Sequence, residues 1–204
     1  MKRLVIDTAT RACSVALFDG NRLLASHYEE IGRGHAEHLV PMIAKLPDRG
    51  RADSIHVNVG PGSFTGIRVG IAAARALALA WNAECFGYTS LSLIAAMARD
   101  RQTEPTSVDA VLPGGHGELF FQSFDAGGIS ISDPESISPL AVQTKSNGRY
   151  LVGDVVRSQV EFQTMPTIMI LPDASQWPLL SKYANVPVAP LYVRAPDAKL
   201  PAPR

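Results

Sequence analysis

Three groups of side chains in this sequence have types and spacing that could do chemistry. The first is Asp7, which ends an apolar run and could coordinate a magnesium–phosphate group, as in an ATPase. The turn after it, Thr8-Ala9-Thr10, has no glycine, so its backbone is less free to approach an anion. We therefore favour a capping or turn-stabilising role for Asp7 and keep ligand binding as the alternative.

The second group is a glycine-rich turn, Gly60-Pro-Gly-Ser-Phe-Thr-Gly66, that leads from a β-branched run into a helix. Exposed amides at a helix N-terminus can bind phosphate. The turn lacks the lysine of GxxxxGK[ST], and its glycines miss the GxGxxG spacing, so neither standard nucleotide loop is present. A plain strand-to-helix connection is the favoured interpretation. The alternative is a vestigial nucleotide or anion loop made by Asp7, Thr8, Gly60, Gly62, Ser63 and Thr65.

The third group is His35 and His38, with Glu37 between them. A zinc-protease helix needs histidines four residues apart with a glutamate directly after the first, and this spacing differs. Elsewhere, only His116 with Glu118 and nearby Asp109 makes a titratable cluster, and no nucleophile and base pair stands out. We expect neither a metal site nor a catalytic site.

These side chains must be positioned by elements that the apolar spacing predicts along the first half. The expected order is three antiparallel strands (3–8, 13–19 and 22–30), a helix (35–46), a strand (54–59), a helix that is capped by Ser63 or Thr65 and runs to Trp81, a strand (84–88) and a helix (90–99). A meander followed by alternating helices and strands predicts an α/β fold with a mixed sheet, the ribonuclease-H-like arrangement.

The second half has a different composition. Twelve of the fifteen prolines follow Arg101, which predicts few long helices and a division into lobes at residues 1–103 and 104–204. We expect a hairpin around Pro113-Gly-Gly-His116, two further strands, a short helix and an irregular tail, at residues 107–112 with 118–125, 150–153, 167–171, 176–184 and 187–204.

Composition narrows the class of protein. Lysine plus arginine equals aspartate plus glutamate at 19 each, so the chain lacks the positive charge that drives independent nucleic-acid binding. Cys13 and Cys85 have no zinc-type pairing and are expected to be buried free thiols. The amino-terminal apolar run is far too short for a signal peptide, so we expect a cytoplasmic protein without membrane attachment.

Two helical surfaces are unusually apolar. On the first helix one face carries His35, His38, Leu39, Met42, Ile43 and Leu46. The second helix repeats small residues every four positions, and its stripe comprises Gly66, Gly70, Ala74 and Ala78 beside Ile67 and Ile71. We predict that these twelve residues form a partner interface, with burial in the internal core as the alternative for about half of them.

Several motifs together resemble one family. Ile6-Asp7-Thr8-Ala-Thr10, the Gly60 turn continued as Ile-Arg-Val-Gly70, and Leu191-Tyr-Val-Arg194 look like the TsaB (YeaZ) family, most closely over the first hundred residues. The resemblance implies the two-lobed fold of actin-like (ASKHA) ATPases. Pro113-Gly-Gly-His116 departs from the Asp-Ala-Arg that relatives usually have there, which puts any contact of that pair in doubt.

The resemblance also implies a function. The family's members are non-catalytic subunits of the bacterial complex that attaches threonylcarbamoyl to the adenosine beside the anticodon of tRNAs reading codons that begin with A (t6A). The implied partners are the catalytic paralogue TsaD and TsaE, a small P-loop ATPase, which hold the metal and ATP. TsaD carries a histidine pair on the helix that corresponds to Thr89–Ala95, where this chain has no histidine. An isolated chain could form a homodimer instead. The alternative function is a small phosphotransferase that holds nucleotide with Asp7 and the Gly60 turn.

Overall fold

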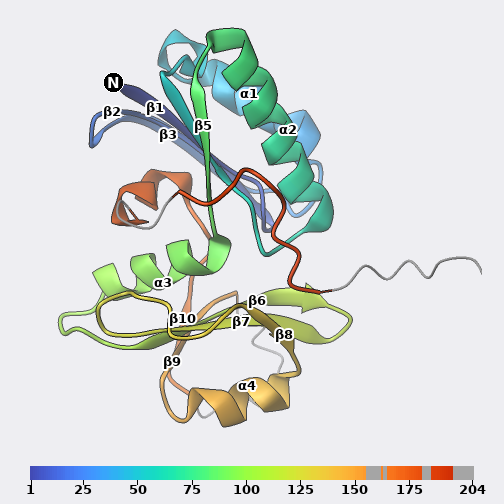
Figure 1. The fold of residues 1–204 in the computed structure, drawn as a ribbon, viewed down its shortest axis with the longest axis vertical. Helices are drawn as coiled ribbons and strands as arrows, with labels where there is room; N and C mark the ends of the chain where they lie inside the picture. Colours follow the sequence, from blue (N-terminus) through green and yellow to red (C-terminus); the bar gives the residue numbers. More distant parts are fainter. Residues whose placement is uncertain (155–161, 163–164, 181–184, 195–204) are drawn as a thin grey trace, which may run out of the picture.

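The computed structural model describes residues 1–154, 162, 165–180 and 185–194. These residues form two five-stranded mixed sheets, one above the other in Figure 1. The described elements therefore make the mixed α/β fold that the sequence predicts. Whether the chain divides into domains between residues 103 and 104 stays a prediction.

The first sheet has the order β3-β2-β1-β4-β5. Its strands are β1 (Lys2–Asp7), β2 (Ala12–Asp19), β3 (Arg22–Glu30), β4 (Ser54–Asn58) and β5 (Glu84–Tyr88). The first three strands form the antiparallel meander, and β4 and β5 run parallel to β1. The crossovers to β4 and β5 contain α1 (His35–Lys45) with the 3-10 helix η1 (Pro47–Gly50), and α2 (Phe64–Trp81). The elements predicted for this half are confirmed to within two residues at their ends.

The second sheet repeats this path with the order β10-β9-β6-β7-β8. Its strands are β6 (Val108–Gly115), β7 (Glu118–Phe124), β8 (Glu135–Ile137), β9 (Tyr150–Gly153) and β10 (Thr167–Met169). A hairpin and a third antiparallel strand lead into α4 (Pro139–Ser146), and β9 then runs parallel to β6 and β10 parallel to β9. The predicted hairpin is confirmed, whereas β8 and α4 were not predicted. Both sheets thus follow the ribonuclease-H-like order.

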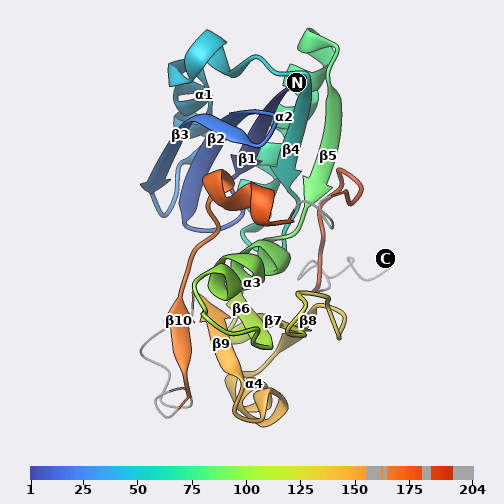
Figure 2. The same ribbon diagram turned by 90° about the vertical axis from the view of Figure 1, so that its left-hand side faces the viewer.

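Two short helices fill the space between the sheets. Figure 2 shows α3 (Ser90–Asp100) and the 3-10 helix η3 (Ala174–Leu180) in this layer. The first packs on β6 and β9, and the second packs on β1 and β2. Their apolar side chains join one buried cluster that includes Phe18, Tyr88 and Trp177. The predicted helix at 176–184 is thus a 3-10 helix that starts earlier, and residues 181–184 lie outside the described part.

The long helix α2 begins where Ser63 caps it, since the Ser63 hydroxyl accepts a hydrogen bond from the Gly66 amide at 3.2 Å. It ends at Asn82, which has a left-handed backbone. Its length and mean hydropathy of 1.3 would suit a membrane span, but the helix lies against the first sheet. A single apolar helix of this kind is weak evidence for a span, and the absence of membrane attachment stays a prediction.

Candidate functional site

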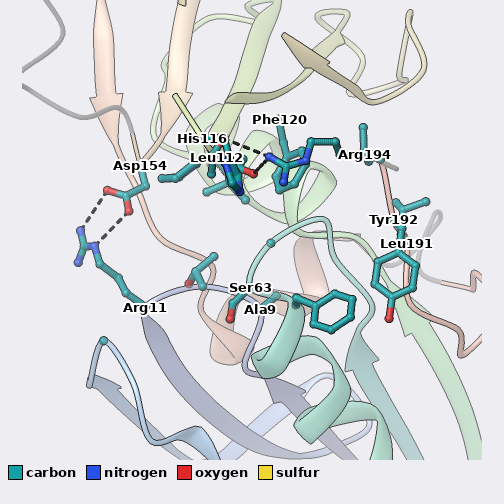
Figure 3. Close-up of a pocket in the computed structure, with 18 residues that line it drawn as sticks. Ala9, Arg11, Ser63, Leu112, His116, Phe120, Asp154, Leu191, Tyr192 and Arg194 are labelled. Carbon is teal, nitrogen blue, oxygen red and sulfur yellow. Dashed lines mark hydrogen bonds and ion pairs between the residues drawn. The ribbon is translucent and has the colours of Figure 1, made fainter. Parts of the chain in front are cut away.

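A cleft of about 730 Å³ opens between the two sheets (Figure 3). Its walls are the turn after β1, the Gly62–Phe64 segment at the start of α2, the tip of the β6–β7 hairpin and residues 191–194. Apolar side chains contribute much of the lining, and they include Phe64, Leu112, Phe120, Leu191 and Val193. The cleft is therefore shaped to take a ligand, but its chemistry depends on the few charged groups at its edge.

The charged groups at this edge are held by other protein groups. Arg11 donates to Asp154 from Nε at 3.1 Å and from Nη2 at 3.2 Å, and it also pairs with Glu30. The hydrogen bond to Asp154 is the main cause that raises the pKa of Arg11. The Arg194 guanidinium lies 3.5 Å from the carbonyl oxygens of Gly114 and Gly115. In Figure 3, Arg11 and Asp154 face one another across one side of the cleft.

Asp7 does not line this cleft. Its side chain is buried with 1% exposure, and its carboxylate accepts hydrogen bonds from Asn58 Nδ2 at 2.6 Å, Tyr88 Oη at 2.9 Å and the Ala9 amide at 3.2 Å. Burial raises the pKa of Asp7 to about 6, and the hydrogen bonds oppose only part of the shift. This geometry agrees with the favoured turn-stabilising role and turns the carboxylate away from any ligand in the cleft.

The glycine turn packs against protein as well. A Cβ on Gly62 would overlap the carbonyl oxygen of Ala9, and a Cβ on Gly66 would overlap that of Thr8. The candidate anion loop is therefore only partly assembled. Gly62 and Ser63 line the cleft, Asp7, Thr8 and Gly60 are buried, and Thr65 is exposed on α2.

The two histidines of α1 do not form a pair. His35 is buried with Nε2 2.8 Å from the Thr10 carbonyl oxygen, whereas His38 is exposed with Nδ1 3.3 Å from Glu29. Among the described residues no group of three or more His, Cys, Asp or Glu side chains is placed to hold a metal ion. The absence of a metal site nevertheless stays a prediction.

The second titratable cluster is not formed either. Asp109 is fully buried near the start of β6 and accepts from Arg149 Nε at 3.1 Å. His116 lies at the other end of that strand, in the hairpin tip. The predicted proximity of His116 and Asp109 is therefore wrong, because six residues of the extended strand β6 lie between them.

The structure also corrects the predicted partner interface. Ten of its twelve residues, His35, Leu39, Met42, Ile43, Leu46, Gly66, Ile67, Gly70, Ile71 and Ala74, are buried within this chain, Ala78 is partly buried, and His38 is exposed. The apolar face of α1 packs on β2. The small-residue stripe of α2 receives the turn after β1, because Thr8 lies where side chains on Gly66 and Gly70 would be. The ten buried residues belong to the internal core and are not free to contact a partner.

The opposite sides of the same helices expose small and apolar residues. We call these the outer helix face, which comprises Ala36, Val40 and Ala44 on α1 and Ala72, Ala76, Leu79 and Ala80 on α2. Val40 is 62% exposed and Leu79 is 86% exposed. The two helices touch and lie side by side on one face of the first sheet (Figure 1). The sequence signal was the spacing of four that links Ala36 to Ala44 and Ala72 to Ala80.

Comparisons with known proteins agree with this structure. The family model described as "TsaD: tRNA N6-adenosine threonylcarbamoyltransferase" matches residues 27–143, more than half of the chain. TsaB of Escherichia coli is 35% identical over 136 residues, which cover 63% of this chain and 58% of that protein. TsaB of Haemophilus influenzae is 33% identical, with 58% of this chain and 51% of that protein covered. The chain thus spans little more than half of these curated relatives.

A solved structure extends the likeness over the whole fold. YeaZ from Pseudomonas aeruginosa superposes with a TM-score of 0.77 at 26% identity, covering 94% of this chain and 99% of that one. This match and the repeated strand order confirm the predicted two-lobed, actin-like fold class. Since the family model covers more than half of its residues, the chain belongs to the TsaD family, within which it is similar to the TsaB (YeaZ) proteins.

Proposed function

We propose that this protein takes part in t6A modification of tRNA as a non-catalytic subunit that binds a TsaD-like catalytic paralogue through the outer helix face. The observation that carries the proposal is that face itself, because two touching helices expose the apolar side chains of Val40 and Leu79, and an exposed apolar surface marks an interaction site. The assignment to t6A modification is supported by the relatives that are named as tRNA threonylcarbamoyladenosine biosynthesis proteins.

Several features support a role without catalysis. The Asp7 carboxylate is buried, hydrogen-bonded to Asn58 and Tyr88 and outside the lining of the cleft, which suits a structural role better than contact with a metal–nucleotide. The start of α3, where the catalytic paralogue is expected to carry its histidine pair, has Ser90, Leu91 and Leu93 packed in the core. The metal and ATP then belong to the partner subunits.

The outer helix face fits a helical partner. Small side chains on α1 and α2 let the backbones of two further helices approach closely, which would give a four-helix arrangement across the interface. A partner of the same fold could supply those helices. A TsaE-like P-loop ATPase would dock on the resulting pair. Without the paralogue, the same face could join two copies of this chain as an isologous homodimer.

Reconstitution with purified proteins tests this function. The chain is expected to co-elute with the TsaD-like paralogue of its own organism, and omission of the chain should abolish t6A formation in the complete mixture. If the two proteins elute separately with the TsaE-like ATPase and nucleotide present, the proposed subunit role is wrong.

One observation favours a second candidate, which is a small phosphotransferase. The cleft of about 730 Å³ is large enough for a nucleotide and receives the N-terminus of α2. Calorimetry of the isolated chain with magnesium ATP separates the candidates. Micromolar binding would favour the enzyme, whereas the proposed subunit role predicts no such binding.

A further inference from the structure

Residues 186–194, which we call the C-terminal strap, run beside β5 (Figure 2) and hydrogen-bond to α2. Val186 and Gly87 exchange two backbone hydrogen bonds of 2.9 Å and 3.0 Å, and the Leu191 amide donates to the Val59 carbonyl oxygen at 2.8 Å. The strap is therefore fixed to the edge strand β5 at Val186 and to the residue that follows β4 at Leu191.

The strap also holds both charged side chains of α2. Arg75 donates from Nη2 to the Val188 carbonyl oxygen at 2.6 Å, and Arg68 donates from Nε to the Tyr192 hydroxyl at 2.8 Å. The Arg68 guanidinium lies 3.6 Å from the centroid of the Phe64 ring, which stacks on Tyr192 at 5.4 Å. The two arginines of α2 thus point toward the strap.

This arrangement decides what α2 presents to solvent. Arg68 and Arg75 are the only charged residues in the helix, and they lie four residues before and three residues after Ala72. On a helix these positions share one side, so a released guanidinium could reach across the small side chains of Ala72 and Ala76. Held by the strap, the arginines leave the α2 part of the outer helix face uncharged.

We propose that the C-terminal strap is a positioning element for partner recognition, which keeps the outer helix face apolar by holding Arg68 and Arg75, and that Tyr192 is its principal positioning residue. The proposal rests on the proposed function, since the occupant of the face is the catalytic paralogue. A freed guanidinium would lie against an apolar interface and would have to be desolvated when the partner binds. The strap thereby raises the affinity of the outer helix face for the paralogue, although the strap is not part of that face.

The test is the dissociation constant of the full-length chain with the catalytic paralogue. Tyr192→Ala is expected to weaken binding about tenfold, a change of about 1.4 kcal/mol. Tyr192→Ala combined with Arg68→Ala is expected to bind within about twofold of Arg68→Ala alone, because the guanidinium that Tyr192 holds is then absent. Tyr192→Phe keeps the ring but loses the acceptor, and its affinity should fall between wild type and Tyr192→Ala. Tyr150→Ala, at an exposed tyrosine of the second sheet, is the matched control and should bind like wild type.

Two results would overturn the inference. One is wild-type affinity in Tyr192→Ala, and the other is a loss that persists after Arg68 is removed, which would mean that Tyr192 touches the partner or only supports the fold. If thermal unfolding shows that Tyr192→Ala does not fold, Tyr192→Phe with and without Arg68→Ala makes the same comparison. Failure of the wild-type chain to bind would instead reject the proposed function, and the inference with it.

Discussion

At the scale of single residues, buried polar side chains form hydrogen bonds that connect different elements of the fold. The Asn58 side-chain oxygen accepts from the Gly60 amide at 2.8 Å and from Ser90 Oγ at 2.9 Å, while its amide donates to Asp7. This network joins the end of β1 to the glycine turn and to the start of α3. The sequence placed Asp7 correctly at a strand end. It could not identify Asn58 and Tyr88 as its partners, because only the assembled sheet brings the ends of β4 and β5 close to the end of β1.

The raised pKa of Asp7 predicts a pH-dependent stability. Burial raises the folded-state pKa to about 6 from 3.8, so the folded state holds the proton more tightly. The stabilisation is fully present below the unfolded-state pKa and is lost as the pH rises through about 6. A shift of this size corresponds to roughly 3 kcal/mol. The free energy of unfolding of wild type relative to Asp7→Asn should therefore fall by that order between about pH 4 and pH 7.

Urea unfolding at a series of pH values measures this difference. The comparison with Asp7→Asn is needed because buried His56, whose pKa burial lowers to about 4, gives wild-type stability the opposite slope over the same range. A difference that stays constant from about pH 4 to pH 7 would show that Asp7 does not titrate in this window.

At the scale of elements, local patterns predicted the first sheet well and the second sheet less well. Helix α4 was not predicted because the many prolines of the second half indicate few long helices, although Pro139 occupies the first helical turn and Ser138 caps it by accepting from the Ala141 amide at 3.3 Å. The sequence analysis assigned the most apolar faces of α1 and α2 to a partner, whereas these faces pack inside the chain and the opposite faces are exposed. Apolar spacing shows that a face is covered, but it does not show whether a sheet or a partner covers it.

Gly66 gives a test of how α2 packs. Alanine favours a helix over glycine by roughly 1 kcal/mol, yet a Cβ on Gly66 would meet the Thr8 carbonyl oxygen. We expect Gly66→Ala to lower the free energy of unfolding by about 2–3 kcal/mol, because backbone must shift to relieve the overlap. Denaturant unfolding measures the change. Ala72→Gly, at an exposed site of the same helix, should cost only about 1 kcal/mol. A Gly66→Ala protein as stable as wild type would contradict this packing.

At the scale of the whole molecule, two sheets of the same strand order share one central layer. Besides α3 and η3, the Arg11–Asp154 pair connects the turn after β1 with the end of β9. The Asp154 side chain is 15% exposed and that of Arg11 is 41% exposed, so water screens this pair less than a pair at the open surface. The sequence could not reveal the connection, since the two residues are 143 positions apart.

This pair predicts a measurable link between the sheets. We expect Asp154→Ala to lower the free energy of unfolding by about 1–2 kcal/mol, because Arg11 loses a partner that accepts two hydrogen bonds. Glu135→Ala removes an exposed ion pair with Lys145 within the second sheet's own elements and should cost less than about 1 kcal/mol. Equal losses in the two variants would show that the Arg11–Asp154 pair stabilises the fold no more than an exposed ion pair does.

The outer helix face is tested most directly by Ala76→Arg. Ala76 is exposed on α2, so the variant should fold with wild-type stability, whereas arginine at the core position Ala74 would disrupt the fold. Calorimetry with the catalytic paralogue should show that Ala76→Arg weakens binding at least about a hundredfold, since a buried, unpaired charge costs roughly 3 kcal/mol or more. Leu140→Arg, at an exposed position on α4, should bind like wild type. An unchanged dissociation constant for Ala76→Arg would contradict the account.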